Sequence, residues 1–367
     1  DAPDIYWTTD FRRSYEETAI FGEITYDIAD NLTVSGSMRQ FDAESYLDGF
    51  SGTVWWPCGG GPSAAAQEAS GNYRPLNNYG ADCADSNRIT ASKDEVYRVT
   101  AEWTVNEDLM VYSSWGEGYR PGGLNRFCSV GNTADYGGQG RDDTTGAQCD
   151  FTPDFLTSYE VGIKATLMDG RMQVNAAAFL QDWDNFQFSR LDTSISPVTL
   201  TYNIGQAKSD GFEADFSIML SETWSLTGAG SYIQAELSQD YYASDGLAAP
   251  TAANGTQLPR VPEVKWNLST RYGFNTDWFV QASYIYTGSS YNNLFDGGSI
   301  PTRRFKQEDY QILNASIGVD RDSWVAEMYV RNLTDERGEV FRNAVNWDER
   351  VMTNRPRTIG TRVSFKF

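Results

Sequence analysis

The chain contains no histidine among its 367 residues. Ser-His-Asp triads, His-ligated zinc and His-ligated haem are therefore excluded within this chain. The sequence also lacks any apolar run approaching the roughly 18 residues that identify a transmembrane helix. Its mean hydropathy is −0.50, so a helical membrane protein is excluded as well.

Positive charge is scarce. The chain has 29 Lys and Arg residues against 50 Asp and Glu residues, which gives a formal net charge of −21. Proteins that bind a phosphate backbone need clustered Lys and Arg. Nucleic acid is therefore not an expected partner.

Cysteine is limited to Cys58, Cys83, Cys128 and Cys149. None belongs to a CxxC pair, so neither a zinc centre nor a redox centre is indicated. Each lies in a polar stretch rich in Gly, Asn, Asp and Ser. We expect two loop disulfides, Cys58–Cys83 and Cys128–Cys149, because short closures lose the least chain entropy. Disulfides imply an oxidising compartment.

The strongest positive signal is strict alternation of apolar and polar residues, which is typical of β-strands. Ile359, Val363 and Phe365 share one face of the last strand, and Arg362 and Lys366 share the other. The same alternation occurs in residues 97–105, 265–274 and 313–320. No segment has the period of a long amphipathic helix, so the pattern predicts an all-β fold.

Short and long connections alternate along the chain. The short ones lie around residues 29–31, 106–108, 169–170, 221–223, 275–277 and 321–323. The long ones cover roughly residues 43–93, 121–154, 184–200, 239–259, 289–308 and 335–355. Six of each connect thirteen strands, and in an up-and-down antiparallel sheet all short turns lie at one end.

The expected strands, of about 10–15 residues, are long enough to cross a bilayer when tilted. Strands of a soluble β-sandwich are shorter, and their loops do not separate by length. Apolar faces end in aromatic residues, and we expect Trp103, Trp266, Trp278 and Trp324 near the short turns. These features favour a transmembrane antiparallel up-and-down β-barrel, with a soluble extracellular adhesin as an alternative.

Several segments contain sequence motifs that occur in a characteristic order along the chain. Residues 17–41 read ETAIFGEITYDIADNLTVSGSMRQF, and residues 112–125 read YSSWGEGYRPGGLN. Residues 158–187 read SYEVGIKATLMDGRMQVNAAAFLQDWDNFQ, and residues 203–216 read NIGQAKSDGFEADF. Residues 327–335 read EMYVRNLTD, and the last residue is Phe. In order and spacing these segments resemble the C-terminal part of the barrel of TonB-dependent outer-membrane receptors.

The resemblance implies a barrel of about 22 strands around a plugged lumen. Residues 1–367 then correspond to the C-terminal portion of the barrel domain, with about 13 strands, and the plug and first strands are expected upstream. It implies no enzyme and no cofactor. It implies a receptor in the bacterial outer membrane, with long extracellular loops, that actively takes up a scarce nutrient.

The resemblance makes an iron–siderophore complex the first expectation for the cargo, before cobalamin, oligosaccharides or small aromatic compounds. Expected partners are outer-membrane lipid and lipopolysaccharide, the TonB energy-transducing complex acting through the N-terminal part, and a small-molecule or metal-chelate ligand. The alternative is a passive porin-like channel of 14–16 strands. Pairing between the first and last strands would favour that channel.

Candidate ligand-binding residues lie in the long loops and at the strand ends, because aromatic residues and Arg dominate binding hot spots. They are Trp55, Trp56, Tyr119, Arg120, Asn125, Arg126, Tyr241, Tyr242, Tyr291, Arg303, Arg304, Trp347 and Arg350. The adjacent pair Arg303 and Arg304 could meet an anionic chelate through charge-assisted hydrogen bonds. For each candidate, a structural role in the aromatic girdle or in loop packing is the competing interpretation. No DxDxDG-type loop predicts a dedicated metal site.

Overall fold

The computed structural model of the chain describes residues 7–53, 86–125, 150–190, 199–243, 247–275, 277–296, 303–345 and 348–365. All regular elements in these ranges are strands, as the alternation predicted. Within them there is no helix with the length and apolar character needed to traverse a membrane.

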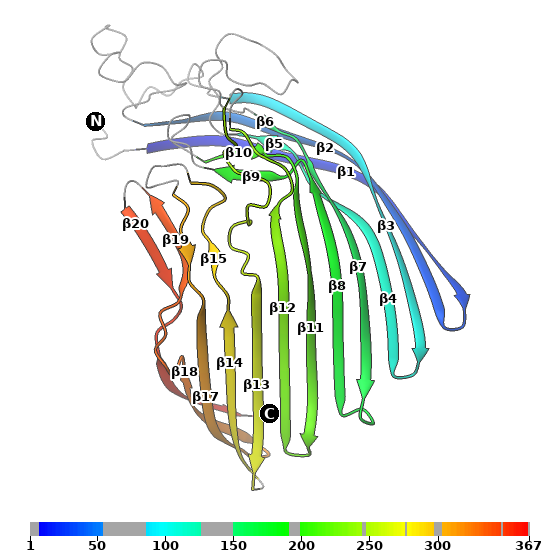
Figure 1. Ribbon diagram of the computed structural model, residues 1–367, viewed down its shortest axis with the longest axis vertical. Helices are drawn as coiled ribbons and strands as arrows, with labels where there is room; N and C mark the ends of the chain where they lie inside the picture. Colours follow the sequence, from blue (N-terminus) through cyan, green and yellow to red (C-terminus); the bar gives the residue numbers. More distant parts are fainter. Residues whose placement is uncertain are drawn as a thin grey trace.

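Thirteen strands form one antiparallel sheet whose order follows the chain (Figure 1). They are β1 (Trp7–Ala29), β2 (Leu32–Thr53), β3 (Ser86–Asn106), β4 (Leu109–Arg120), β7 (Asp154–Leu167), β8 (Met172–Asp184), β11 (Ala207–Ser221), β12 (Trp224–Leu237), β13 (Val264–Phe274), β14 (Trp278–Thr287), β17 (Tyr310–Asp320), β18 (Trp324–Arg331) and β21 (Thr358–Phe365). This confirms the predicted up-and-down topology and strand number.

The six short turns connect these strands at one end of the sheet, at the positions that the sequence predicted. Two of them use residues in the left-handed region. Asp169 has φ 55° and Asn275 has φ 58°. Asp and Asn tolerate this conformation better than most residues, which explains the composition of these turns.

The opposite end is more ordered than the sequence predicted. Residues interpreted as loops form four small two-stranded sheets. They are β5 (Gly123–Leu124) with β6 (Asp150–Phe151), β9 (Gln187–Arg190) with β10 (Leu200–Asn203), β15 (Ser290–Tyr291) with β16 (Lys306–Gln307), and β19 (Glu339–Val345) with β20 (Asp348–Thr353). Strands β1 to β3 also extend well beyond the predicted length, and their upper parts bend across the top of the sheet (Figure 1).

The register separates the sheet into two faces. Lys164, Asn175 and Asp215 lie directly opposite one another on β7, β8 and β11, on what we call the polar face. Their neighbours Ile163 and Ala176 lie on the other side, which we call the apolar face. Because successive strand residues point to opposite sides, a shift of one residue would exchange the two faces.

The last strands follow the same division. Arg362 of β21 lies opposite Glu327 of β18, and the two side chains approach within 3.6 Å. Ile359, Val363 and Phe365 belong to the apolar face and are largely exposed. The predicted assignment of Arg362 to the polar side of the barrel wall is therefore consistent with the observed ion pair.

Aromatic residues of the apolar face gather at both ends of the strands. Phe274 stacks with Trp278 beside a short turn, at a ring distance of 6.4 Å. Trp266 lies at the opposite end of β13, where its ring is 5.0 Å from that of Tyr284. The expected place of Trp266 near a short turn was therefore wrong, because β13 starts at a long connection. Girdles at both interfaces are typical of membrane barrels.

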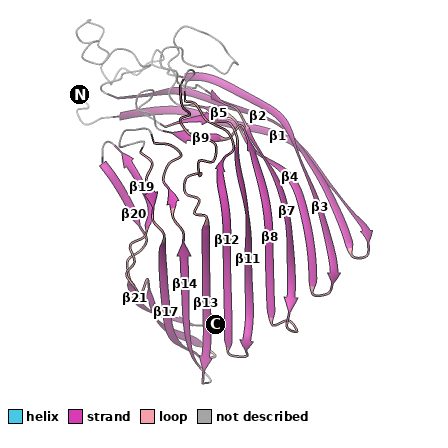
Figure 2. Ribbon diagram, viewed as in Figure 1, coloured by secondary structure: helices cyan, strands magenta, loops and turns pink. Residues whose placement is uncertain are grey.

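Among the described residues, β1 pairs only with β2 and β21 only with β18. The two strands lie at opposite ends of the curved sheet (Figure 2). The direct pairing of first and last strands that would have favoured a small closed channel is absent from this part of the chain.

Candidate functional site

The upper ends of the strands, opposite the short turns, enclose a compact group of buried side chains that we call the loop core. It consists of Phe186, Leu200, Tyr202, Ile204, Ala207, Ala235, Leu237, Tyr241, Ala252, Leu258, Leu294 and Phe295. These residues come from three long connections and from the ends of β11 and β12. Burial of this much apolar surface holds the connections together as one packed layer.

Arg120 fixes the end of β4 to this layer. Its Nε atom donates to both carboxylate oxygens of Asp154 at 3.0 Å, and its Nη2 atom contacts the same carboxylate and the Gln187 carbonyl. The guanidinium also lies over the rings of Trp183 and Phe186, at 5.6 and 5.3 Å. Asp154 is fully buried. The charge of Arg120 is thus matched within the protein, so Arg120 acts as an anchor.

Asn125 has a comparable structural task. Its side-chain amide donates to the Thr201 carbonyl and its side-chain oxygen accepts from the Thr201 amide, both at 2.8 Å. The side chain thereby makes the same pair of hydrogen bonds to the β10 backbone that a neighbouring strand would make. Asn125 is 5% exposed, which leaves little of it available to a ligand.

Tyr119 is also engaged. Its ring stacks on Phe41 at 3.7 Å, and its hydroxyl donates to Glu17 at 3.0 Å. Glu17 also accepts hydrogen bonds from Tyr15 and Arg39. The cluster ties the upper part of β4 to β1 and β2 where these two strands bend.

The remaining described candidates fall into two groups. Tyr241 is buried in the loop core, 6.1 Å from the ring of Phe295. Tyr242, Arg303 and Arg350 are exposed. Arg304 and Tyr291 lie together in a crevice, where the guanidinium is 3.6 Å from the ring centre. Trp55, Trp56, Arg126 and Trp347, and the predicted disulfides Cys58–Cys83 and Cys128–Cys149, lie outside the described residues.

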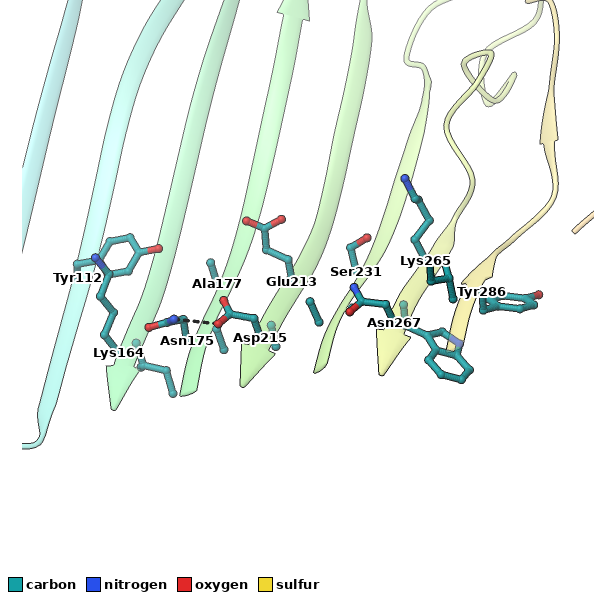
Figure 3. Close-up of a pocket in the computed structure, with 17 residues that line it drawn as sticks. Tyr112, Lys164, Asn175, Ala177, Glu213, Asp215, Ser231, Lys265, Asn267 and Tyr286 are labelled. Atoms are coloured by element: carbon teal, nitrogen blue, oxygen red, sulfur yellow. Dashed lines mark hydrogen bonds between the residues drawn. The ribbon is translucent and has the colours of Figure 1, made fainter. Parts of the chain in front are cut away.

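The polar face carries a cavity of about 440 Å³ across strands β4 to β14 (Figure 3). Tyr112 donates to Glu160 at 2.7 Å, and the Lys164 ammonium lies 5.8 Å from the Tyr112 ring. Asn175 donates to Asp215 at 3.0 Å. The wall therefore offers charges of both signs together with amide and hydroxyl groups.

A second cavity of about 520 Å³ lies on the polar face of β13 to β21. Arg271 approaches Asp320 at 3.6 Å and its guanidinium covers the ring of Phe279. Arg331 and Arg362 both lie over Tyr329, at 5.2 and 5.8 Å. In the described ranges, no group of three or more acidic, Cys or His side chains could hold a metal ion. This wall is suited to polar contact with another surface or with a solute.

Sequence reasoning missed several members of these networks. Asp154, Gln187 and Glu17 hold the candidate residues in place, yet each is an ordinary polar residue in its own segment. Their partners lie at sequence separations of 33 for Gln187 and Asp154 and 102 for Tyr119 and Glu17. Only the pairing of the strands reveals such contacts, so no local signal could have identified them.

Comparison with known proteins supplies the family. The sequence model described as "TonB dependent receptor-like, beta-barrel" matches residues 1–333. A probable TonB-dependent siderophore receptor of Acinetobacter baumannii, PiuA, is 23% identical over 272 residues, which are 74% of this chain and 33% of that protein. The metal-pseudopaline receptor CntO of Pseudomonas aeruginosa is 31% identical over 152 residues, which are 40% of this chain and 20% of that protein.

The solved structures agree on the fold. The ferric yersiniabactin uptake receptor FyuA of Yersinia pestis superimposes on 98% of this chain with a TM-score of 0.69 and 19% identity. The chain covers 46% of that structure. The chain thus spans about half of this solved structure and about a third or less of the curated relatives' length.

Proposed function

Because the chain belongs to the TonB-dependent receptor family, we propose that it forms part of the barrel wall of a bacterial outer-membrane receptor for active uptake of an iron–siderophore complex. The observation that carries the proposal is the open thirteen-stranded sheet, since unpaired strand edges are not viable in lipid. Further strands must cover β1 and β21. We infer from these open edges and from the family resemblance that residues 1–367 form the C-terminal portion of a larger barrel domain.

The proposed cargo rests on the relatives. Several are described by name as siderophore receptors, among them PiuA and the catecholate siderophore receptor Fiu of Escherichia coli. The transport requires no covalent chemistry. It requires a TonB energy-transducing partner that acts through the N-terminal part of the receptor, and long connections that face the outside of the cell.

The exposed candidates are the proposed contacts of the cargo. Tyr242, Arg303 and Arg350 present their side chains to solvent at the end of the barrel that carries the long connections. Trp55, Trp56, Arg126 and Trp347 belong to the same set as sequence predictions. Arg120, Asn125, Tyr119 and Tyr241 are assigned instead to the support of this surface, because each is already engaged within the protein.

The test is growth of an iron-starved strain in which the gene for the intact receptor has been deleted and then restored. We expect restored growth on a matching ferric siderophore, and loss of that growth when TonB is also removed. A passive channel is the alternative. Uptake that continues without TonB would support that channel and contradict the receptor.

A further inference from the structure

The cavity of about 520 Å³ on the polar face of β13 to β21 differs in charge from the rest of the wall. Three of its lining residues are the arginines Arg271, Arg331 and Arg362, and two are the acidic residues Asp320 and Glu327. The cavity across β4 to β14 is instead lined by two lysines and two carboxylates. Positive charge is thus in excess at one place on the polar face of a chain whose net charge is −21.

The three guanidinium groups keep most of their hydrogen-bonding capacity. Arg271 lies 3.6 Å from Asp320, and the same distance separates Arg362 from its acidic partner Glu327. Both distances exceed the roughly 2.7–2.9 Å of a charge-assisted hydrogen bond. Arg331 has no carboxylate within ion-pair distance in the described part of the chain. Because a guanidinium carries several N–H donors, this wall can bind an anion without breaking either ion pair.

Tyr329 holds two of the arginines at the surface of the wall. The guanidinium of Arg331 lies 5.2 Å from the centre of its ring, and that of Arg362 lies 5.8 Å from it. Gly360 lies directly opposite Tyr329, and a Cβ atom added there would come within 2.5 Å of the Tyr329 hydroxyl oxygen. The ring therefore lies close against the neighbouring strand, with a cation on either side of it along the wall.

Phe279 has the same role for Arg271, whose guanidinium lies 3.5 Å from the centre of the ring. Gly318 lies directly opposite Phe279, and a Cβ atom added there would lie 2.5 Å from the Cζ atom of the ring. A cation–π contact orients a guanidinium without neutralising its charge. The positions of the three cations are therefore set largely by aromatic rings, which leaves their charge available to a solute.

The three cations follow one another along the wall. Arg331 is the last residue of β18, on the side of the long connections, and Arg362 lies opposite Glu327, four residues closer to a short turn. This separation corresponds to roughly 13 Å of strand. Arg271 approaches Asp320, the last residue of β17 before that turn. A solute that moves from the long connections to the short turns would meet the cations in this order.

Several weak sites in succession suit the passage of an ion better than one strong site. A strong site retains the ion, whereas a wall without opposite charge excludes it. Charge of one sign in a cleft also raises the local concentration of the opposite ion. Gln281 and Ser316 line the same cavity and supply an amide and a hydroxyl group that can replace water around the solute.

We propose that Arg331, Arg362 and Arg271, which we call the arginine column, form a transit site inside the barrel for a carboxylate-bearing anionic metal chelate. The planar guanidinium suits this class because it pairs with a carboxylate through two parallel hydrogen bonds. The proposal rests on the proposed uptake function and names the chemical class of its cargo. The arginine column is separate from the exposed loop surface that is the proposed first contact of the cargo.

The first test compares chelates in a strain that has the intact receptor and no other receptor for ferric chelates. The probes carry radioactive iron in ferric citrate or ferric rhizoferrin, which are anionic carboxylate chelates, or in ferrichrome, which is a neutral hydroxamate chelate. We expect uptake of a carboxylate chelate that depends on TonB, and no comparable uptake of ferrichrome. Uptake of ferrichrome alone would overturn the arginine column but leave the uptake function standing. Uptake of none of the probes would overturn the arginine column, and the growth assay would then decide separately on the uptake function.

The second test uses Arg331→Gln, which removes a cation without leaving a carboxylate unpaired. We expect the initial uptake rate at saturating chelate to fall about fivefold, because a charge-assisted contact inside the barrel is lost. Binding to cells without TonB should change less than about twofold, since the loop surface is untouched. Arg98→Gln is the matched control on the polar face of β3, where Arg98 lies between Ser37 and Gly116 and faces no second cation. It should change the uptake rate less than about twofold.

The other outcomes overturn the arginine column. Equal losses of uptake in Arg331→Gln and Arg98→Gln would show that any cation of the polar face has the same effect. A parallel loss of binding would assign Arg331 to the loop surface. Uptake by Arg331→Gln without TonB would mean that Arg331 holds the N-terminal part of the receptor in the lumen. If Arg331→Gln does not reach the membrane, Arg331→Lys replaces it. This variant keeps the charge but not the planar fork, so an uptake rate below that of the wild type with unchanged binding is expected, and an unchanged rate contradicts the proposal.

Discussion

At the scale of single residues, glycines of the polar face make room for aromatic rings on the neighbouring strand. Gly162 lies directly opposite Tyr112, and Gly360 directly opposite Tyr329. A Cβ atom added at either glycine would lie 2.5 Å from atoms of the tyrosine. Glycine weakens a strand by itself, so its presence here reflects this close approach.

We expect Gly162→Ala to lower the free energy of unfolding by about 1–3 kcal/mol, because overpacking must displace a tyrosine whose hydroxyl is bonded to Glu160. Gly36→Ala is the matched control, since nothing lies within 4 Å of its added Cβ. It should change stability by no more than about 0.5 kcal/mol. Urea unfolding of the intact receptor measures both, and equal effects would show that the ring is free to move.

Asn332, the first residue after β18, shows how one side chain can hold the following segment in place. Asn332 is buried, and its side chain donates to the carbonyls of Glu336 and Arg355 and accepts from the Glu336 amide. Its φ of 53° explains the choice of Asn. These hydrogen bonds give Asn332 a structural role where the chain leaves β18.

Asp335, in the same segment after β18, predicts that the stability of the folded protein depends on pH. The Arg357 amide donates to Asp335 at 2.8 Å, and this hydrogen bond, with the nearby charge of Arg337, lowers the pKa of the carboxyl. Because the folded pKa lies below the unfolded one, the stabilisation is present above the unfolded pKa of about 3.9 and is lost as the pH falls through the folded pKa. Asp335→Asn should therefore be less stable than the wild type at pH 7, and the difference should shrink at about pH 3. Thermal unfolding at both pH values checks this, and a difference that does not change with pH would contradict it.

At the scale of elements, the sequence determined the main strands better than the connections. Alternation and polar turns sufficed for the thirteen strands because each strand exposes one apolar face along its full length. The small sheets in the long connections were missed because they depend on distant side chains. Asn125 orders β10 from a position 76 residues away, which no local pattern can reveal.

The anchor of the β9–β10 hairpin can be tested directly. Arg120→Gln leaves the buried Asp154 carboxylate without its cation, although the Gln187 amide still donates to it at 2.9 Å. We expect Arg120→Gln to lower the free energy of unfolding by about 1–3 kcal/mol. This is less than the loss expected when a fully buried ion pair is broken, because the Arg120 side chain is partly exposed. The variant should also be cleaved faster by protease within residues 184–206.

Arg321→Gln is the control for this change. It removes a pair with Asp277 in which the Arg321 side chain is largely exposed, and such pairs contribute about 0–1 kcal/mol. If the two variants unfold at the same urea concentration, Arg120 is not an anchor. Its side chain would then return to the set of cargo candidates.

At the scale of the whole molecule, the fold was readable from the sequence, but the surroundings of each candidate residue were not. Arg120 and Asn125 were candidate ligand contacts, yet both take part in the packing of the connections. Arg303 and Arg304 are adjacent, but the structure leaves the first exposed and places the second in a crevice beside the end of β12. Residue type and loop position do not encode such differences, because they arise from the bending and pairing of segments far apart.

The open edges of the sheet give the last prediction. In the intact receptor, with the four native cysteines replaced by serine, Thr25→Cys on β1 and Ser364→Cys on β21 should not form a disulfide under mild oxidation. Both positions lie on the polar face, so a direct pairing of the two strands could bring them together. The positive control is Thr25→Cys with Ser35→Cys, since these side chains lie opposite each other with their hydroxyl oxygens 3.1 Å apart. A second control joins Ser364 to its partner Val325 on β18 by the same substitution. Further strands between β1 and β21 would keep the first pair apart, because neighbouring strands lie about 4.8 Å from each other and several must fit between them. Efficient cross-linking of Thr25→Cys with Ser364→Cys would instead mean that the two edges close on each other, as in a small passive channel.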